Sequence, residues 1–172
     1  MFVIKFLISA TIVVLTTYIG FSKSKKIKNR EYILREFISF LELVKNEINY
    51  NMCILPNAYE VSRQKLATSL KDSIGAIATD MLASQNAQSI DISIVTNINL
   101  IEELSDYDKN IIISILRNLG RSDIESQTNI INNGITILEN QVKEANEIKL
   151  STSKMYRSMG AIVGLMIVVI FI

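Results

Sequence analysis

The sequence predicts an all-α protein, an antiparallel bundle of about six helices over residues 22–157. An N-terminal transmembrane helix, residues 1–21, and a short C-terminal one, residues 158–172, are expected to flank it. Three observations predict this class: both chain ends are strongly apolar, the segments between them repeat apolar residues at helical spacing, and glycine-rich hairpins are missing from the sequence. The 172 residues leave room for one domain with its anchors.

The first apolar stretch is long enough to span a bilayer. Residues 2–21 are apolar apart from Lys5 and scattered Ser and Thr, and twenty residues cover about 30 Å as a helix. A cleaved signal peptide is the alternative, but such peptides carry their positive charge before the apolar run. Five basic residues follow this run instead, which favours an uncleaved anchor; they are Lys23, Lys25, Lys26, Lys28 and Arg30.

Basic residues at both ends of the bundle predict its orientation. Lys23, Lys25 and Lys26 follow the first anchor, while Lys154 and Arg157 precede the second, so we expect all five at the membrane interface. The positive-inside rule then places the bundle in the cytoplasm and both termini outside. Residues 31–147 hold all 17 acidic residues and nine basic ones, about −8 in net charge, which argues against nucleic acid as a partner.

The first half of the bundle is predicted from apolar spacing and from Pro56. A helix from about 27 to 52 continues from the first anchor, and Pro56 ends it and opens the next. Further helices are expected over about 56–69, 71–85 and 91–104, with a polar loop over 85–89 and a strand as the alternative near 90–94. The expected buried positions are Leu34, Phe37, Ile38, Leu41, Val44, Ile48, Ala58 or Tyr59, Val61, Leu66, Ile74, Ile77, Ala78, Met81, Leu82, Ile92, Val95 and Ile98.

Ser105 is expected to cap the fifth helix, with Asp106 and Asp108 favouring the positive end of its dipole. Gly120 suits the left-handed position that closes this helix. The buried face of this helix is expected to be Ile111, Ile112, Ile115, Leu116 and Leu119.

A long final helix is expected to start at Ser122, which forms a capping-box pattern with Glu125. Gly134 inside it should weaken the helix by roughly 0.5–1 kcal/mol relative to alanine. Its apolar and small residues follow alternating steps of four and three, a heptad seam that suits packing inside a bundle. The seam comprises Ile124, Thr128, Ile131, Ile135, Leu138, Val142 and Ala145.

The C-terminal apolar segment is short for a membrane span. Residues 159–172 lack charge and cover about 21 Å as a helix, against a hydrocarbon core of about 30 Å. A short true span is preferred over a tail embedded in one leaflet or held by a partner protein. Gly160 and Gly164 form a G-x-x-x-G pair that brings transmembrane helices close together.

Catalytic chemistry finds little support in the sequence, so no enzyme, cofactor or metal site is predicted. The chain has no His, no phosphate-binding GxxxxGK[ST] loop and one cysteine, Cys53, which is read as a small core or interface residue. The densest acidic group is either a solvated helix start or a docking patch for a basic partner. It consists of Glu102, Glu103, Asp106 and Asp108.

Three segments give the chain a resemblance to the stage III sporulation protein AB family. Residues 154–165, which include Met155 and Tyr156, resemble the family's C-terminal signature. The run 119–123, with Gly120, Ser122 and Asp123, and then Gln127, is similar to a second family segment. Residues 47–50 followed by 55–56 are similar to the segment that closes the family's first cytoplasmic helix.

The resemblance implies a membrane scaffold like the inner-membrane platform protein of type II secretion systems, carrying one copy of its F-domain bundle. It implies a place in the mother-cell membrane, within the channel complex that links mother cell and forespore. The implied partners are the ATPase called stage III sporulation protein AA, other proteins of that complex, and further copies of the chain. The alternatives are a membrane-anchored regulatory or signalling adaptor whose acidic body binds a basic partner, and a membrane enzyme that uses carboxylates.

Overall fold

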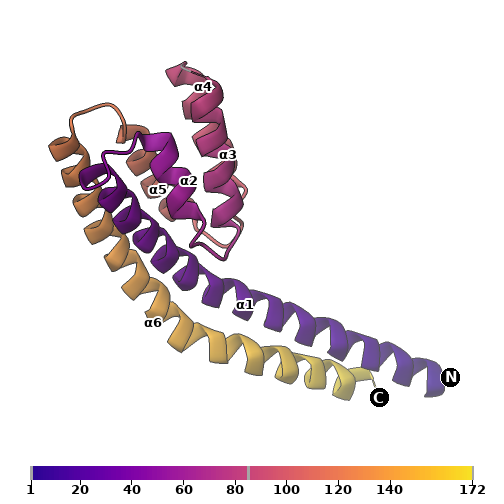
Figure 1. Ribbon diagram of the computed structural model, residues 1–172. Helices are drawn as coiled ribbons and strands as arrows, with labels where there is room; N and C mark the ends of the chain where they lie inside the picture. The colour runs from indigo at the N-terminus through magenta and orange to yellow at the C-terminus, as the bar shows by residue number, and fades with distance from the viewer. Residues whose placement is uncertain (1, 85, 172) are drawn as a thin grey trace. The chain divides into compact units, whose positions relative to one another are not determined.

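The computed structural model describes the backbone of residues 2–84 and 86–171; apart from Tyr18 and Ser22, the side chains described lie within 25–84 and 86–151. These residues form six helices and no strand, which confirms the all-α class (Figure 1). The helices are α1 (Phe2–Asn49), α2 (Leu55–Arg63), α3 (Leu70–Ala83), α4 (Ala87–Asn99), α5 (Asp106–Asn118) and α6 (Ile124–Phe171).

The chain divides into two compact units. Unit 2 is Tyr32–Val142, which holds the second part of α1, the helices α2 to α5 and the first part of α6. Unit 1 combines Met1–Glu31 with Lys143–Ile172. Unit 2 is shorter at both ends than the expected bundle, residues 22–157.

The core of unit 2 starts from the apolar stripe of α1. The rings of Phe37 and Phe40 stack with their centroids 5.7 Å apart, and Tyr59 of α2 meets Phe40 edge-on at 5.2 Å. All three rings are fully buried. Phe40 was not in the predicted stripe. The expected positions that are buried are Leu34, Phe37, Leu41, Val44, Ile48, Ala58, Tyr59, Leu66, Ile74, Ile77, Ala78, Ile98, Ile112, Ile115, Leu116 and Leu119.

The second helix ends six residues earlier than predicted. Pro56 lies in its first turn, as expected, but α2 stops at Arg63. The reason is a tertiary contact, because the carboxylate of Glu36 in α1 accepts hydrogen bonds from the backbone N–H groups of Ala67 and Thr68 and from the Thr68 hydroxyl. A carboxylate that satisfies these backbone donors stabilises a turn where helix was expected.

The segment that was predicted as helix over 91–104, with a strand as the alternative, is helical but shifted. The α4 helix starts four residues earlier, because the Asn86 side chain accepts a hydrogen bond from the backbone N–H of Gln88 at 3.0 Å. Its alternating isoleucines do not form a strand: Ile94 is buried, whereas Ile92 is 61% exposed. Ile92 was wrongly expected in the core, as were Val61 and Leu82, which are 45% and 60% exposed.

The turn between α5 and α6 follows the prediction at Gly120, whose φ is +81°. The N-terminal cap of α6 differs from the prediction. Asp123, not Ser122, caps the helix, because its Oδ1 accepts the backbone N–H of Ser126 at 2.7 Å. This bond lowers the pKa of the Asp123 carboxyl. The carbonyl of Ser122 instead accepts a hydrogen bond from the side-chain amide of Gln127 at 2.8 Å.

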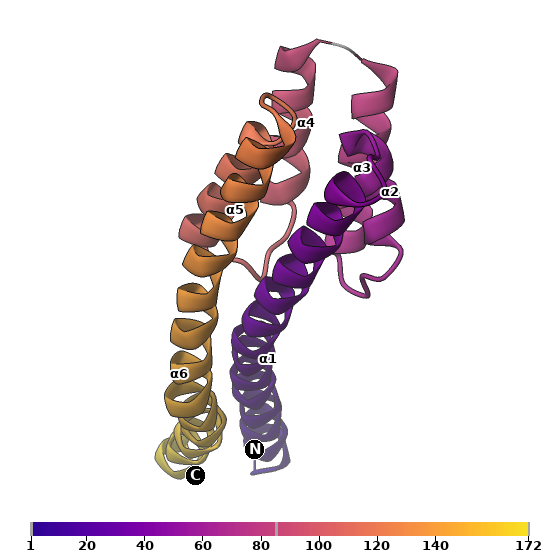
Figure 2. The ribbon, with the colours of Figure 1, turned by 60° about the vertical axis from the view of Figure 1, so that its left-hand side comes forward.

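Gly134 has a packing role that the helix pattern did not reveal. A Cβ at this position would lie 2.7 Å from Cδ1 of Ile115, so the glycine lets α5 and α6 approach closely (Figure 2). The heptad seam is buried at Ile131, Leu138, Val142 and Ala145. Its first member, Ile124, is 42% exposed and was wrongly included, because the helix begins at that residue.

In unit 1, α1 and α6 are antiparallel and joined by ion pairs. Nζ of Lys149 lies 2.6 Å from Oε2 of Glu31, and Nη1 of Arg30 lies 3.7 Å from Oε1 of Glu144. Among the described residues, none of the helices offers a stretch long and apolar enough to cross a bilayer. Apart from Tyr18, the expected membrane segments 1–21 and 158–172 fall outside the residues whose side chains are described.

Candidate functional site

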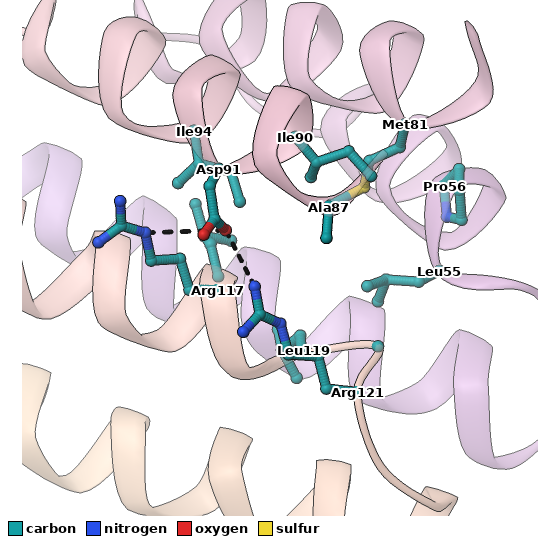
Figure 3. Close-up of a pocket in the computed structure, with 12 residues that line it drawn as sticks. Leu55, Pro56, Met81, Ala87, Ile90, Asp91, Ile94, Arg117, Leu119 and Arg121 are labelled. Carbon is teal, nitrogen blue, oxygen red and sulfur yellow. Dashed lines mark hydrogen bonds and ion pairs between the residues drawn. The ribbon is translucent and has the colours of Figure 1, made fainter. Parts of the chain in front are cut away.

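The candidate site is a hollow of about 260 Å³ in unit 2, which we call the arginine pocket (Figure 3). Three parts of the chain meet there: the start of α2, the facing sides of α3 and α4, and the end of α5 with the turn that follows it. Its lining residues are Leu55, Pro56, Met81, Ala87, Ile90, Asp91, Ile94, Leu116, Arg117, Leu119, Gly120 and Arg121.

Gly120 shapes one wall of the arginine pocket. Its left-handed backbone turns the chain after α5, and a Cβ there would lie 2.9 Å from Cδ2 of Leu55. Only glycine therefore satisfies both the backbone angle and the close approach to α2. The turn that it makes brings Leu119 and Arg121 to the same hollow.

Three charged side chains form the rim of the arginine pocket. Oδ1 of Asp91 lies 3.1 Å from Nη2 of Arg121 and 3.8 Å from Nε of Arg117, as the dashed lines in Figure 3 show. Within the described part of the chain, no other carboxylate forms an ion pair with either arginine. One carboxylate thus faces two guanidinium groups, which leaves a local charge of about +1 and several free N–H donors.

The rest of the pocket is apolar. We call the buried side chains of Ile94, Leu116 and Leu119 its floor, and the half-buried side chains of Met81 and Ile90 line it as well. An apolar hollow with a cationic edge suits an apolar side chain that has a carboxylate next to it. Among the described residues, no three His, Cys, Asp or Glu side chains come together as a metal site would require.

A family model described as stage III sporulation protein AB matches residues 5–172. The chain belongs to this family. Its role therefore lies in stage III of sporulation, and its partners lie within the sporulation machinery. No curated protein and no solved structure matches the chain.

In this member of the stage III sporulation protein AB family, two segments that carry the resemblance meet at the arginine pocket. Leu55 and Pro56 belong to one, and Leu119, Gly120 and Arg121 belong to the other. Sequence reasoning did not single out Asp91, because 30 residues separate it from Arg121 and no motif links them. The packing of α4 on α5 brings them together.

The predicted acidic group lies at the opposite end of α4 and α5. Glu102 and Asp106 are exposed and Glu103 is half-buried. Asp108, in contrast, is fully buried, because it forms a capping box with Ser105. Its Oδ2 accepts hydrogen bonds from the Ser105 backbone N–H at 3.0 Å and from the Ser105 hydroxyl at 2.7 Å. Asp108 is therefore a structural cap, and its carboxylate is not available to a docking protein.

The expected membrane-interface residues are described only in part. Lys25 and Lys26 of α1 are exposed. The side chains of the others lie outside the described residues, as do those of the expected glycine pair and of the C-terminal family motif. These are Lys23, Lys154, Arg157, Gly160, Gly164, Met155 and Tyr156.

Cys53 lies between α1 and α2 and is half-buried. Its Sγ is 3.7 Å from Oε2 of Glu47. Burial, followed by the negative charge of Glu47 and this contact, raises the pKa of the thiol. A raised pKa keeps the thiolate population small, which agrees with the reading of Cys53 as a packing residue.

Proposed function

We propose that this protein is a membrane-attached scaffold of the complex that links mother cell and forespore. Unit 2 lies in the mother-cell cytoplasm and meets a secretion-type ATPase of the kind called stage III sporulation protein AA. Membership of the family supports the sporulation role. The complex, the mother-cell membrane and the ATPase are what the resemblance to the family implies, and the topology rests on the physical arguments that follow.

The observation that carries the proposal is the antiparallel pairing of α1 and α6 in unit 1. Ion pairs join Glu31 to Lys149 and Arg30 to Glu144, and each helix continues without interruption toward its apolar terminal segment. Two paired antiparallel helices deliver the segments 1–21 and 158–172 to the same side. Because both anchors enter the membrane from the same side, the whole of unit 2 lies on that side. The lysines that flank the anchors favour the cytoplasmic side.

The topology can be tested with a thiol placed where the structure exposes it. Cys53 is half-buried and its pKa is raised, so it reacts slowly. Tyr50 is 82% exposed in the same connection. We expect Tyr50→Cys, in a Cys53→Ser background, to react with a membrane-impermeant maleimide only after lysis of sporulating cells whose wall has been removed.

The Cys53→Ser chain without the new thiol is the matched control, and a denatured sample shows that the thiol can react. Labelling of Tyr50→Cys in intact cells would place unit 2 outside and would overturn the scaffold proposal. A second position, Leu82→Cys, should behave in the same way, because Leu82 of α3 is 60% exposed.

The contact with the ATPase is tested by co-purification of the full chain from sporulating cells. The exposed members of the acidic group, Glu102 and Asp106, are the proposed docking residues. Glu102→Lys with Asp106→Lys should reduce recovery of the ATPase about tenfold, whereas Glu139→Lys, an exposed carboxylate on α6, should leave it unchanged. Full recovery with both reversals would contradict docking at this group.

A regulatory adaptor is the second candidate function, favoured by the same exposed carboxylates. An adaptor would bind its basic partner without the companion ATPase present. Co-purification from a strain that lacks the ATPase therefore separates the two functions, because a scaffold would then lose its main partner.

A further inference from the structure

The helices α4 and α5 form a hairpin whose two ends carry opposite charge. The arginine pocket lies at the end where α4 starts and α5 finishes. The connection between the helices lies at the other end, and we give the name acidic corner to five exposed or half-buried residues of this connection and of the first turn of α5. The acidic corner consists of Leu100, Glu102, Glu103, Asp106 and Tyr107.

The two ends cannot meet within one chain. Each helix has 13 residues, which corresponds to about 20 Å of rise. The packing of α4 on α5 fixes that separation. The acidic corner therefore cannot reach the arginine pocket of its own chain, and a corner that fills the pocket must belong to another molecule.

Both ends have apolar side chains next to their charges. In the acidic corner Leu100 is 70% exposed and Tyr107 is 62% exposed. In the arginine pocket the half-buried side chains of Leu55, Met81 and Ile90 lie beside the buried floor of Ile94, Leu116 and Leu119. At about 260 Å³, the pocket is smaller than the roughly 300–1,000 Å³ of small-molecule sites, so it fits a protein side chain better than a free ligand.

The charges complement each other in sign. Arg117 and Arg121 share the single carboxylate of Asp91, which leaves about +1 at the pocket. The acidic corner has three carboxylates. The ammonium group of the nearby Lys109 donates a hydrogen bond to the backbone carbonyl of Asn99 at 3.1 Å, which adds one positive charge. The corner therefore keeps about −2, and its carboxylates can accept the guanidinium donors that the pocket leaves free.

We propose that two copies of this chain associate head to tail, with the acidic corner of one copy in the arginine pocket of the next. Leu100 enters the apolar floor, and Glu102 and Asp106 pair with Arg117 and Arg121. Such an interface joins two different surfaces, so repetition produces a ring or an open chain and not a closed dimer. This inference concerns contacts between copies and is independent of membrane topology. It uses the carboxylates that are also proposed to meet the ATPase, so one acidic corner serves one of the two partners at a time; the pocket variant Arg117→Glu with Arg121→Glu keeps the corner intact and should lose self-association alone.

Charge reversal on the detergent-solubilised full chain tests the proposal. The pocket variant is Arg117→Glu with Arg121→Glu, and the corner variant is Glu102→Arg with Asp106→Arg. Each should weaken self-association at least tenfold in sedimentation experiments, while Lys65→Glu, an exposed cation in the turn after α2, should not. Added salt should weaken the wild-type association in the same direction.

Mixing distinguishes this geometry from misfolding and from other interfaces. Each variant keeps one intact surface, and the two reversed surfaces are complementary to each other, so an equal mixture should regain association with the two variants alternating. A chain that carries all four reversals should associate with itself again. A mixture that stays monomeric, single variants that associate as wild type does, or a monomeric wild-type chain would overturn the proposal.

Cysteine cross-linking in membranes of sporulating cells tests the contact in place. In the Cys53→Ser background, Leu100→Cys with Ala87→Cys should give a ladder of disulfide-linked copies, because position 87 lines the pocket. Each single cysteine should give no ladder and at most trace dimer. Strong dimers from Leu100→Cys alone would indicate a symmetric contact, and a cross-link to a different protein would indicate another occupant; either result overturns the inference.

Discussion

The two units of the chain are held by contacts of different kinds. In unit 2 the rings of Phe37, Phe40 and Tyr59 lie in a fully buried cluster. In the described part of unit 1, α1 and α6 are joined by the ion pairs Arg30–Glu144 and Lys149–Glu31, of which the Glu31 carboxylate is buried. Apolar burial contributes about 25 cal/mol per Å², whereas a solvent-exposed ion pair contributes about 0–1 kcal/mol and the attraction within a buried pair is offset by the cost of desolvating its charges. Unit 2 thus carries its own apolar core, whereas charged contacts join α1 and α6 in the described part of unit 1.

Removal of the central ring should have the largest effect. Phe40→Ala should lower the free energy of unfolding of unit 2 by about 3–5 kcal/mol, because the buried ring leaves a cavity. Hydrogen exchange of amides in α2 to α5, in the full chain in mild detergent, measures this loss. Leu82→Ala removes apolar groups from an exposed position and should change stability by less than about 0.5 kcal/mol. Equal losses in both variants would contradict a core centred on Phe40.

The close approach of α5 and α6 should respond to one added methyl group. Gly134→Ala should destabilise unit 2 by about 1–2 kcal/mol, because overpacking against Cδ1 of Ile115 outweighs the gain in helix propensity. Thermal unfolding measures the change. Ile115→Val removes that Cδ1 atom, so the double variant should recover part of the loss. A more stable Gly134→Ala chain would show that only helix propensity matters at this position.

The buried hydroxyl of Tyr59 should cost stability. It has no hydrogen-bond partner within the described residues, and burial raises its pKa. Tyr59→Phe keeps the ring and should raise the free energy of unfolding by about 1 kcal/mol, since an unsatisfied buried group costs about 1–3 kcal/mol. Urea denaturation compares it with Tyr107→Phe, where the exposed ring should show no change. A destabilised Tyr59→Phe chain would indicate a bonding partner for the hydroxyl.

The ion pairs of unit 1 should give the smallest effect. Lys149→Met removes one partner of Glu31, which keeps a further interaction, and should cost about 1 kcal/mol. Faster hydrogen exchange around residues 143–149, with unchanged exchange in α2 to α5, is the expected result. Lys143→Met, at an exposed position on the same helix, should leave the exchange unchanged. A loss that spreads to α2–α5 would mean that the two units are not energetically separate.

Much of the fold could be predicted because its determinants are local. Apolar spacing located the buried faces of α1, α5 and α6, while Pro56, Ser105 and Gly120 marked helix ends through their own backbone chemistry. The errors occurred where a distant group intervened. Glu36 ends α2 early through bonds to Ala67 and Thr68, which lie 31 and 32 residues away.

The candidate site shows the same difference between features set by local sequence and features set by distant groups. The sequence identified the acidic residues that follow α4, since charge density is visible along a chain, but it also included Asp108, whose side chain is buried in a cap. The sequence did not predict Asp91 and Arg117 as site residues, because isolated charges on amphipathic helices resemble ordinary solvated positions.

The sequence alone determined the helical class, the family and the apolar ends, because these depend on periodicity, motifs and composition. Only the tertiary structure decided that Asp91 faces Arg117 and Arg121, that Gly134 makes room for Ile115, and that pocket and corner occupy opposite ends of one hairpin. These contacts depend on the packing of helices against one another, and the periodicity within one helix does not specify which other helix packs against it.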